Sequence, residues 1–161
     1  MYTQINERVA AEMIDSALAF CQAKIGNKKA FCQLRINNPN AIEHFRYGLA
    51  REIGACLGEN SEFVKDVYIF PDTLDEDPIL TLPLTLIVYV EKHTAALESV
   101  VELLQDNFLE EYRNVFSPIT DNLSVFLNIL LVDMTELAER KGLAASIGSV
   151  CKPALRAWSR R

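Results

Sequence analysis

Two histidines are the first candidates for chemistry in this chain of 161 residues, because a general base at neutral pH is most often a histidine. His93 follows Glu91 and Lys92 at the end of a long apolar segment, where we expect a strand to meet a helix. His44 stands beside Glu43 in the first turn of an expected helix, which favours a surface position. The two are not spaced as a metal-binding pair, and neither has a nucleophile within reach in the sequence. The sequence therefore predicts no catalytic residue and no metal site.

The four cysteines, Cys21, Cys32, Cys56 and Cys151, are the next candidates. No two of them form a CxxC pair, which excludes a zinc ribbon and a thioredoxin-like redox motif. The first three fall at apolar positions of expected helices or strands, so we expect buried free thiols, whereas Cys151 beside the basic tail should be exposed. Free thiols indicate a reducing compartment, and no signal peptide or membrane-length apolar run is visible. We therefore expect a cytoplasmic protein.

An acidic loop is the remaining candidate for ion binding, with carboxylates at Asp72, Asp75, Glu76 and Asp77. Carboxylates bind hard cations, but this loop lacks the central glycine and the distant glutamate of a calcium loop. A solvated hairpin tip is the simpler interpretation. The glycine-rich motifs that bind nucleotide phosphates are also absent. We therefore predict no cofactor.

The segment from Leu80 to Val90 is the expected centre of the fold. Every even position in it is apolar, and a period of two predicts a long β-strand with one fully apolar face. Around it, apolar residues that recur every three or four positions predict helices, and shorter alternating runs predict strands. We expect long helices over 5–25, over 40–58 with Asn40 as its cap, and from Thr94 to about Ser117, and we expect strands over 30–36, 63–70 and 123–131. A capping box of Asp133 and Glu136 should start a short helix over 133–142, and Pro153 should open a terminal helix.

The order of the central elements is β-α-β-β-α-β, which is the pattern of a ferredoxin-like core. The sequence thus predicts an α+β protein with four antiparallel strands and two long helices on one face of the sheet. We expect a single domain over 1–161, composed of an N-terminal helix (1–29), an α+β core (30–132) and a C-terminal helical segment (133–161).

In this arrangement the second face of the sheet is largely apolar. It would carry Phe31, Gln33, Arg35, Ile87, Tyr89, Phe126 and Leu130, with Tyr68 or Phe70 beside them. So large an apolar surface is rarely bare on a monomer, so we expect the terminal helices or a second subunit to cover it. Phe31 and Phe126 are therefore candidate interaction residues. Leu155 and Trp158 are two more, because the Arg/Trp-rich tail can dock into the body or into a partner.

Three functions remain open at this point. The leading hypothesis is a non-enzymatic protein-interaction or regulatory module that acts as a homodimer. The alternative is a small-molecule-binding domain or an enzyme with a pocket between the sheet and the terminal helices, in which Arg35, Tyr89 and His93 supply the polar groups. Nucleic-acid binding ranks third, because the net charge is −6 and RNA-recognition signatures are missing.

Overall fold

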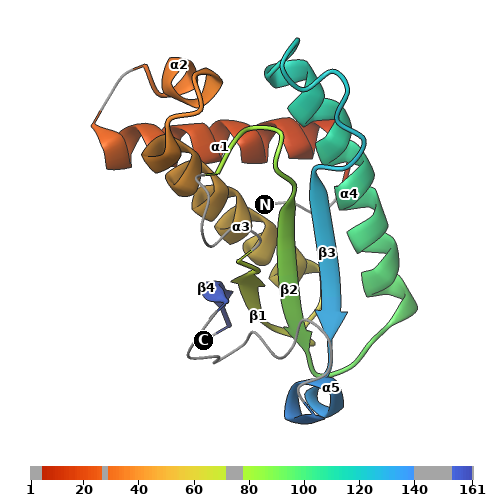
Figure 1. The fold of residues 1–161 in the computed structure, drawn as a ribbon. Helices are drawn as coiled ribbons and strands as arrows, with labels where there is room; N and C mark the ends of the chain where they lie inside the picture. The colour runs from red at the N-terminus through yellow and green to blue at the C-terminus, as the bar shows by residue number, and fades with distance from the viewer. Residues whose placement is uncertain (1–4, 27–28, 72–77, 140–153, 161) are drawn as a thin grey trace.

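A computed structural model describes residues 5–26, 29–71, 78–139 and 154–160, and the structural statements that follow concern these residues. The protein is α+β, and α1, α3 and α4 pack with the sheet around the main hydrophobic core (Figure 1). In chain order the elements are α1 (Glu7–Ile25), α2 (Ala30–Arg35), α3 (Pro39–Asn60), β1 (Val64–Ile69), β2 (Leu84–Val90), α4 (Ala95–Val115), β3 (Leu127–Val132), α5 (Met134–Glu139) and β4 (Leu155–Ser159).

The sheet is mixed, with the strand order β3-β2-β1-β4. β1 is antiparallel to both β2 and β4, whereas β2 and β3 are parallel. A parallel pair needs a long crossover connection, and α4 is that connection. As a result, the C-terminal ends of β2 and β3 meet at one edge of the sheet.

The prediction of an antiparallel, ferredoxin-like sheet was therefore wrong, and its first expected strand is absent. Residues 30–35 form α2, in which Ala30 and Leu34 are buried one helical turn apart. Phe31 stacks on the ring of Phe116, with centroids 5.4 Å apart. An apolar run this short fits the period of a strand and that of a helix equally well. The packing of Phe31 against Phe116, at the C-terminal end of α4, favours the helix.

The predicted terminal helix was also wrong over the residues that can be compared, because Leu155–Ser159 forms β4 on the edge of β1. The register shifts between Trp158 and Arg156, so Ala157 is an extra residue in a β-bulge. Both Ala157 and Trp158 pack into the main core. Because of the bulge, the apolar residues of β4 do not alternate strictly with polar ones along the sequence. The segment therefore resembles the apolar stripe of a helix, which explains the error. The expected helix end at Gly142 and Pro153 lie outside the described residues.

Polar contacts also fix β4 against α3. The guanidinium of Arg160 donates hydrogen bonds to the carbonyl oxygens of Gly58 (2.7 Å), Ser61 (2.8 Å) and Val64 (2.9 Å). Carbonyls at a helix C-terminus lack partners within the helix, and a cationic side chain satisfies them well. The residue after β4 therefore ties the chain end to the end of α3.

The three long helices were predicted correctly, and their caps show why. Asn6 and Thr94 accept hydrogen bonds from backbone N–H groups in the first turns of α1 and α4, and Gly26 ends α1 in the left-handed conformation with φ of 65°. Asn38, rather than the expected Asn40, caps α3. Each cap lies directly beside an apolar stripe, so the ends of these helices can be predicted from the sequence.

The central strand is shorter than predicted and starts at Leu84. Pro83 has no N–H to donate to a neighbouring strand. Leu80 lies outside the strand but is buried in the main core. Side chains satisfy its backbone groups in place of strand pairing: its N–H donates to Asn37 Oδ1 (2.9 Å), and its carbonyl accepts from Tyr112 Oη (2.6 Å). The last predicted strand likewise starts later, at Leu127, because residues 123–126 form an irregular segment with bends.

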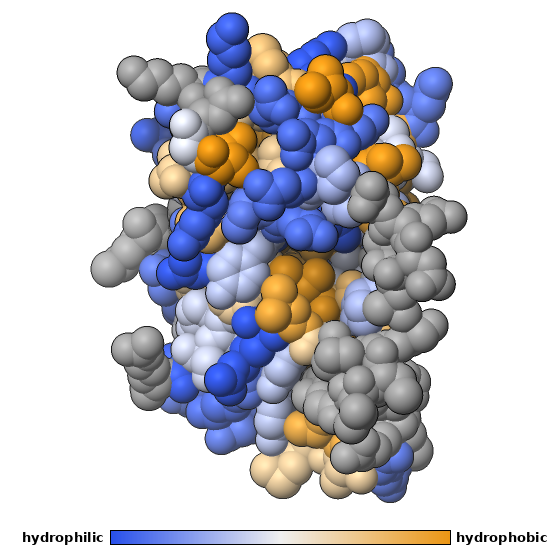
Figure 2. All heavy atoms as spheres, turned by 60° about the vertical axis from the view of Figure 1, so that its left-hand side comes forward, coloured by the Kyte–Doolittle hydropathy of each residue, from blue (hydrophilic) through white to orange (hydrophobic). Residues whose placement is uncertain are grey.

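The second sheet face carries a small separate cluster in which Ile87 and Val132 are buried, with Leu137 of α5 packed against them. Larger exposed apolar side chains gather elsewhere, around α2. Figure 2 shows apolar residues at the upper end of the molecule, the end at which α2 lies in Figure 1. Four exposed residues belong to α2 or to segments hydrogen-bonded to its C-terminal end, and we call them the end patch: Phe31, Ile36, Ile79 and Ile119. Among the described helices, none has the length and apolar character needed to cross a membrane.

Candidate functional site

The candidate site lies where the parallel strands β2 and β3 end. His93 comes three residues after the end of β2, in the turn before α4. Asp133 directly follows β3, and Glu136 lies in the first turn of α5. Side chains that follow neighbouring parallel strands share one edge of a sheet, which is the usual place for a ligand site. Parallel pairing thus brings together residues that are 40 or more positions apart in the sequence.

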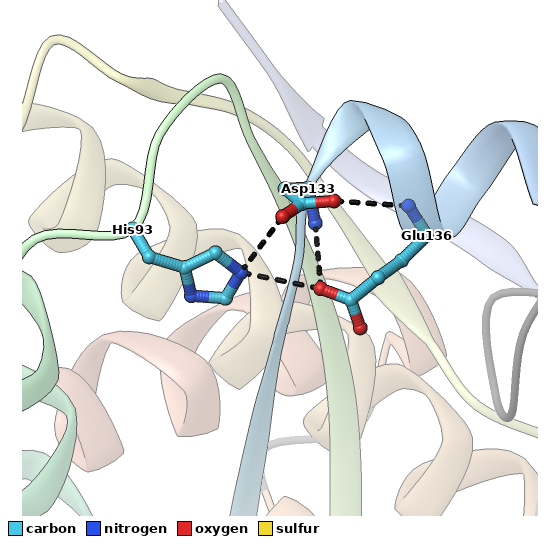
Figure 3. A group of neighbouring side chains, drawn as sticks. All are labelled: His93, Asp133 and Glu136. Atoms are coloured by element: carbon cyan, nitrogen blue, oxygen red, sulfur yellow. Dashed lines mark hydrogen bonds and ion pairs between the residues drawn. The ribbon is translucent and has the colours of Figure 1, made fainter.

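The three side chains point toward one another (Figure 3). His93 Nε2 lies 3.6 Å from Asp133 Oδ2 and 3.3 Å from Glu136 Oε1. Between 32% and 41% of each side chain is exposed. The cluster is therefore reachable from solvent but partly shielded from it.

A capping box holds the two carboxylates in place. The N–H of Glu136 donates to Asp133 Oδ1 (2.9 Å), and the N–H of Asp133 donates to Glu136 Oε1 (3.4 Å). The S/T/D-x-x-E pattern predicts this box, and the structure confirms it. Because Asp133 uses Oδ1 for the cap, its other oxygen, Oδ2, faces His93. The helix start therefore also orients the carboxylates toward the imidazole.

The geometry suits a divalent transition metal. Zinc bound tetrahedrally at bond lengths of about 2.0–2.2 Å has ligand atoms about 3.3 Å apart. The His93–Glu136 and His93–Asp133 separations, 3.3 and 3.6 Å, are close to that value, and one ligand atom from each residue fits within 4.8 Å of the others. The same distances also allow an ion pair between a protonated His93 and the carboxylates. A metal ion and a proton would therefore compete for His93 Nε2.

Of the predicted ligand-binding residues, the structure keeps two near this site and separates the third. Tyr89 lies on β2 beside Val132 in the strand ladder, close to the end of β3. Arg35 ends α2 and donates to the carbonyl of Ser117 (2.9 Å). Figure 1 shows α2 and α5 at opposite ends of the molecule. Arg35 thus does not converge with His93 on one pocket.

The predicted interaction residues divide between core and surface. Phe126 is buried, and its ring stacks on that of Tyr112 with centroids 3.6 Å apart. Trp158 lies against α3, close enough that a Cβ atom on Gly54 would be 2.5 Å from its own Cβ. Phe31 and Leu155 remain on the surface, 39% and 57% exposed. Phe126 is therefore closed to a partner, whereas Trp158 is partly buried and Phe31 and Leu155 are exposed.

The thiols offer no reactive site in the core. Cys21 and Cys56 are buried free thiols, as predicted, whereas Cys32 is exposed on α2, contrary to the prediction. Burial raises the pKa of the Cys56 thiol to about 12, and the negative charge of Glu59 adds to the effect. A thiol with a raised pKa is a poor nucleophile at neutral pH. Cys151 and the acidic residues of 72–77 lie outside the described residues.

Sequence reasoning missed Asp133 and Glu136 as site residues. It identified them as a capping box but treated the box as purely structural. The usable signal was their position directly after a predicted strand, at the same relative place as His93 after the central strand. With an antiparallel pairing of those strands the two ends would not meet, so the wrong strand direction hid the site.

Comparison of the chain with protein-family models, with curated proteins and with solved structures finds no match. The functional argument therefore depends on the geometry of this site.

Proposed function

We propose that this protein binds a divalent transition-metal ion through His93, Asp133 and Glu136. The observation that supports the proposal is the convergence of one imidazole nitrogen and two carboxylate oxygens from two separate turns of the chain. His93 Nε2, Asp133 Oδ2 and a carboxylate oxygen of Glu136 are the proposed ligand atoms.

The ligand set selects the class of metal. Calcium and magnesium prefer oxygen ligands alone, whereas an imidazole nitrogen favours zinc, copper, iron or nickel, and the two carboxylates also suit manganese. Three protein ligands leave at least one coordination position for water or for an oxygen of a bound ligand. A site of this kind can act as a Lewis acid, so the proposal belongs to the ligand-binding or enzymatic class of functions.

Isothermal titration calorimetry with Zn²⁺ and with Mn²⁺ tests the proposal, and the chain offers well-matched variants. Asp133→Asn and Glu136→Gln keep the capping box, because asparagine caps as well as aspartate and glutamine can replace glutamate in the box. Each removes one anionic ligand. Loss of an outer-shell partner alone weakens metal binding by about 10- to 100-fold, so loss of a direct ligand should weaken it at least as much.

One bound Zn²⁺ or Mn²⁺ per chain in the wild type, with weakened binding in Asp133→Asn, Glu136→Gln and His93→Gln, is the expected result. Glu139→Gln, on the same helix, is the control and should bind like the wild type. Equal heats for the wild type and the three ligand variants would show that the cluster is only an ion-paired helix cap.

A second function is favoured by a different observation, the end patch of Phe31, Ile36, Ile79 and Ile119. Hydrogen bonds connect the segments that carry it: Arg35 to the carbonyl of Ser117, and the N–H of Leu80 to Asn37 Oδ1. Exposed apolar residues gathered in this way are typical of protein interfaces. The proposal is that two copies associate through this patch, as an interaction module in a reducing, cytoplasmic setting that suits the free thiols.

Sedimentation velocity over a range of protein concentrations tests the second proposal. The wild type should form a dimer, and Ile36→Asp, at a side chain that is 70% exposed, should be monomeric without loss of stability. Leu103→Asp is the control, because Leu103 is 47% exposed on α4, outside the patch. A wild type that stays monomeric at every concentration would refute association through this patch.

A further inference from the structure

A second concave site lies away from the His93 cluster, between α1, α3 and β4. It encloses about 290 Å³ and is lined by Phe20, Gly48, Arg51 and Trp158 among others. In Figure 1, α1 crosses the upper part of α3, and β4 lies nearer its lower end. The volume is near the lower limit of small-molecule sites, which fits a ligand of one or two rings.

Two aromatic rings border this pocket because α3 has small residues where they lie. A Cβ atom on Gly48 would be 3.0 Å from Phe20 Cδ1, so glycine lets α1 approach α3 closely. Trp158 lies over the glycines at 54 and 58, farther along the same helix. Ala55 also lines the pocket. The pocket is thus lined by two aromatic side chains and small residues together with polar ones, and aromatic ligands pack well against aromatic rings.

Arg51 supplies a cation at this site. Its guanidinium carbon lies 5.7 Å from the ring centroid of Phe20 and 6.0 Å from that of Tyr47. Within the described part of the chain, these ring contacts are the interactions that hold it. A guanidinium beside aromatic rings can still donate two parallel hydrogen bonds to a carboxylate through its N–H groups.

The charges of the residues that line the pocket limit the class of ligand that it can bind. Glu52, next to Arg51 on α3, also lines the pocket. Its negative charge disfavours a second anionic group and hence phosphates and dicarboxylates. We propose that this pocket binds a small aromatic monocarboxylate, with the ring between Phe20 and Trp158 and the carboxylate on Arg51. This site is independent of the proposed metal function.

The single tryptophan makes the test direct, because Trp158 gives one indole N–H signal in a ¹⁵N-correlation NMR spectrum. Benzoate and its neutral analogue benzamide are the two probes, titrated into the chain of 161 residues. Benzoate should shift the indole signal saturably, and benzamide should bind about tenfold or more weakly, since it lacks the charge that strengthens the hydrogen bonds to Arg51.

Variants separate the proposal from nonspecific binding. Arg51→Gln should reduce benzoate affinity about tenfold or more and bring it close to that of benzamide, whereas Arg8→Gln, an equal charge change at an exposed site on α1, should leave it unchanged. The same spectra report whether each variant is folded. An indole signal that does not move, equal shifts with both probes, or unchanged affinity in Arg51→Gln would each overturn the proposal.

Discussion

The packing of Trp158 on α3 predicts that Gly58→Ala destabilises the protein when the Trp158 ring is present and stabilises it when the ring is removed. A Cβ atom on Gly58 would lie 2.5 Å from Trp158 Cη2 and 2.6 Å from Cζ2. Ordinary contact begins at 3.4 Å, so the ring or the helix in Gly58→Ala must move by 0.9 Å. Overpacking of this kind costs about 1–3 kcal/mol, whereas alanine gains about 1 kcal/mol over glycine in a helix. Gly58→Ala should therefore destabilise the protein by about 0–2 kcal/mol.

Removing the ring should reverse this effect. Trp158→Leu keeps the atoms that lie beside Gly54 but lacks Cζ2 and Cη2. The next neighbour of a Cβ atom on Gly58 is Arg160 Nη2 at 3.4 Å, which is an ordinary contact. In the Trp158→Leu background, Gly58→Ala should therefore stabilise the protein by up to about 1 kcal/mol, which gives a coupling energy of about 1–3 kcal/mol between the two positions.

Urea unfolding followed by far-ultraviolet circular dichroism measures all four proteins of this cycle, since that signal does not require the tryptophan. A coupling energy near zero would refute the reasoning. It would mean that the Trp158 ring does not contact Gly58. The packing of β4 beside α3 would then also be wrong.

Two further predictions concern buried groups. Tyr112→Phe keeps the ring stack but leaves the buried carbonyl of Leu80 without its donor, so it should lower the free energy of unfolding by about 1–3 kcal/mol in urea unfolding at pH 7. The pKa of the Cys56 thiol is raised from 9.0 to about 12 in the folded protein, so its contribution to stability is complete below pH 9 and is lost as the pH rises toward 12. Unfolding measured at pH 8 and at pH 10.5 should therefore show a loss, of up to about 1.4 kcal/mol per pH unit above pH 9, that is smaller in Cys56→Ala. An equal loss in that variant would contradict the assignment.

The long helices could be predicted from the sequence because each has a sustained apolar stripe and a cap next to it. α3 illustrates this, since about six turns of stripe outweigh its glycines at 48, 54 and 58. The two errors of element type, at α2 and β4, fall on segments of five or six residues. Over so short a length, tertiary packing decides between helix and strand, as the stacking of Phe31 and the bulge at Ala157 show.

Strand direction was the error with consequences for function. The sequence between β2 and β3 contains a 21-residue helix, which is compatible with a parallel crossover, but the expected first strand favoured an antiparallel arrangement. Once that strand is recognised as α2, β2 and β3 pair directly and in parallel. His93 and Asp133 then follow adjacent strand ends, and the capping box brings Glu136 to them. Of these three residues, only His93 was identified as a candidate from the sequence.

The most direct test of the central claim is X-ray absorption at the zinc edge, recorded on protein loaded with one equivalent of Zn²⁺ and then dialysed. The proposed site predicts retained zinc with one imidazole and oxygen ligands at about 2.0–2.2 Å and with no sulfur ligand. The imidazole signature should disappear in His93→Gln. Loss of the zinc on dialysis, a sulfur ligand, or an unchanged spectrum in His93→Gln would contradict a metal site formed by His93, Asp133 and Glu136.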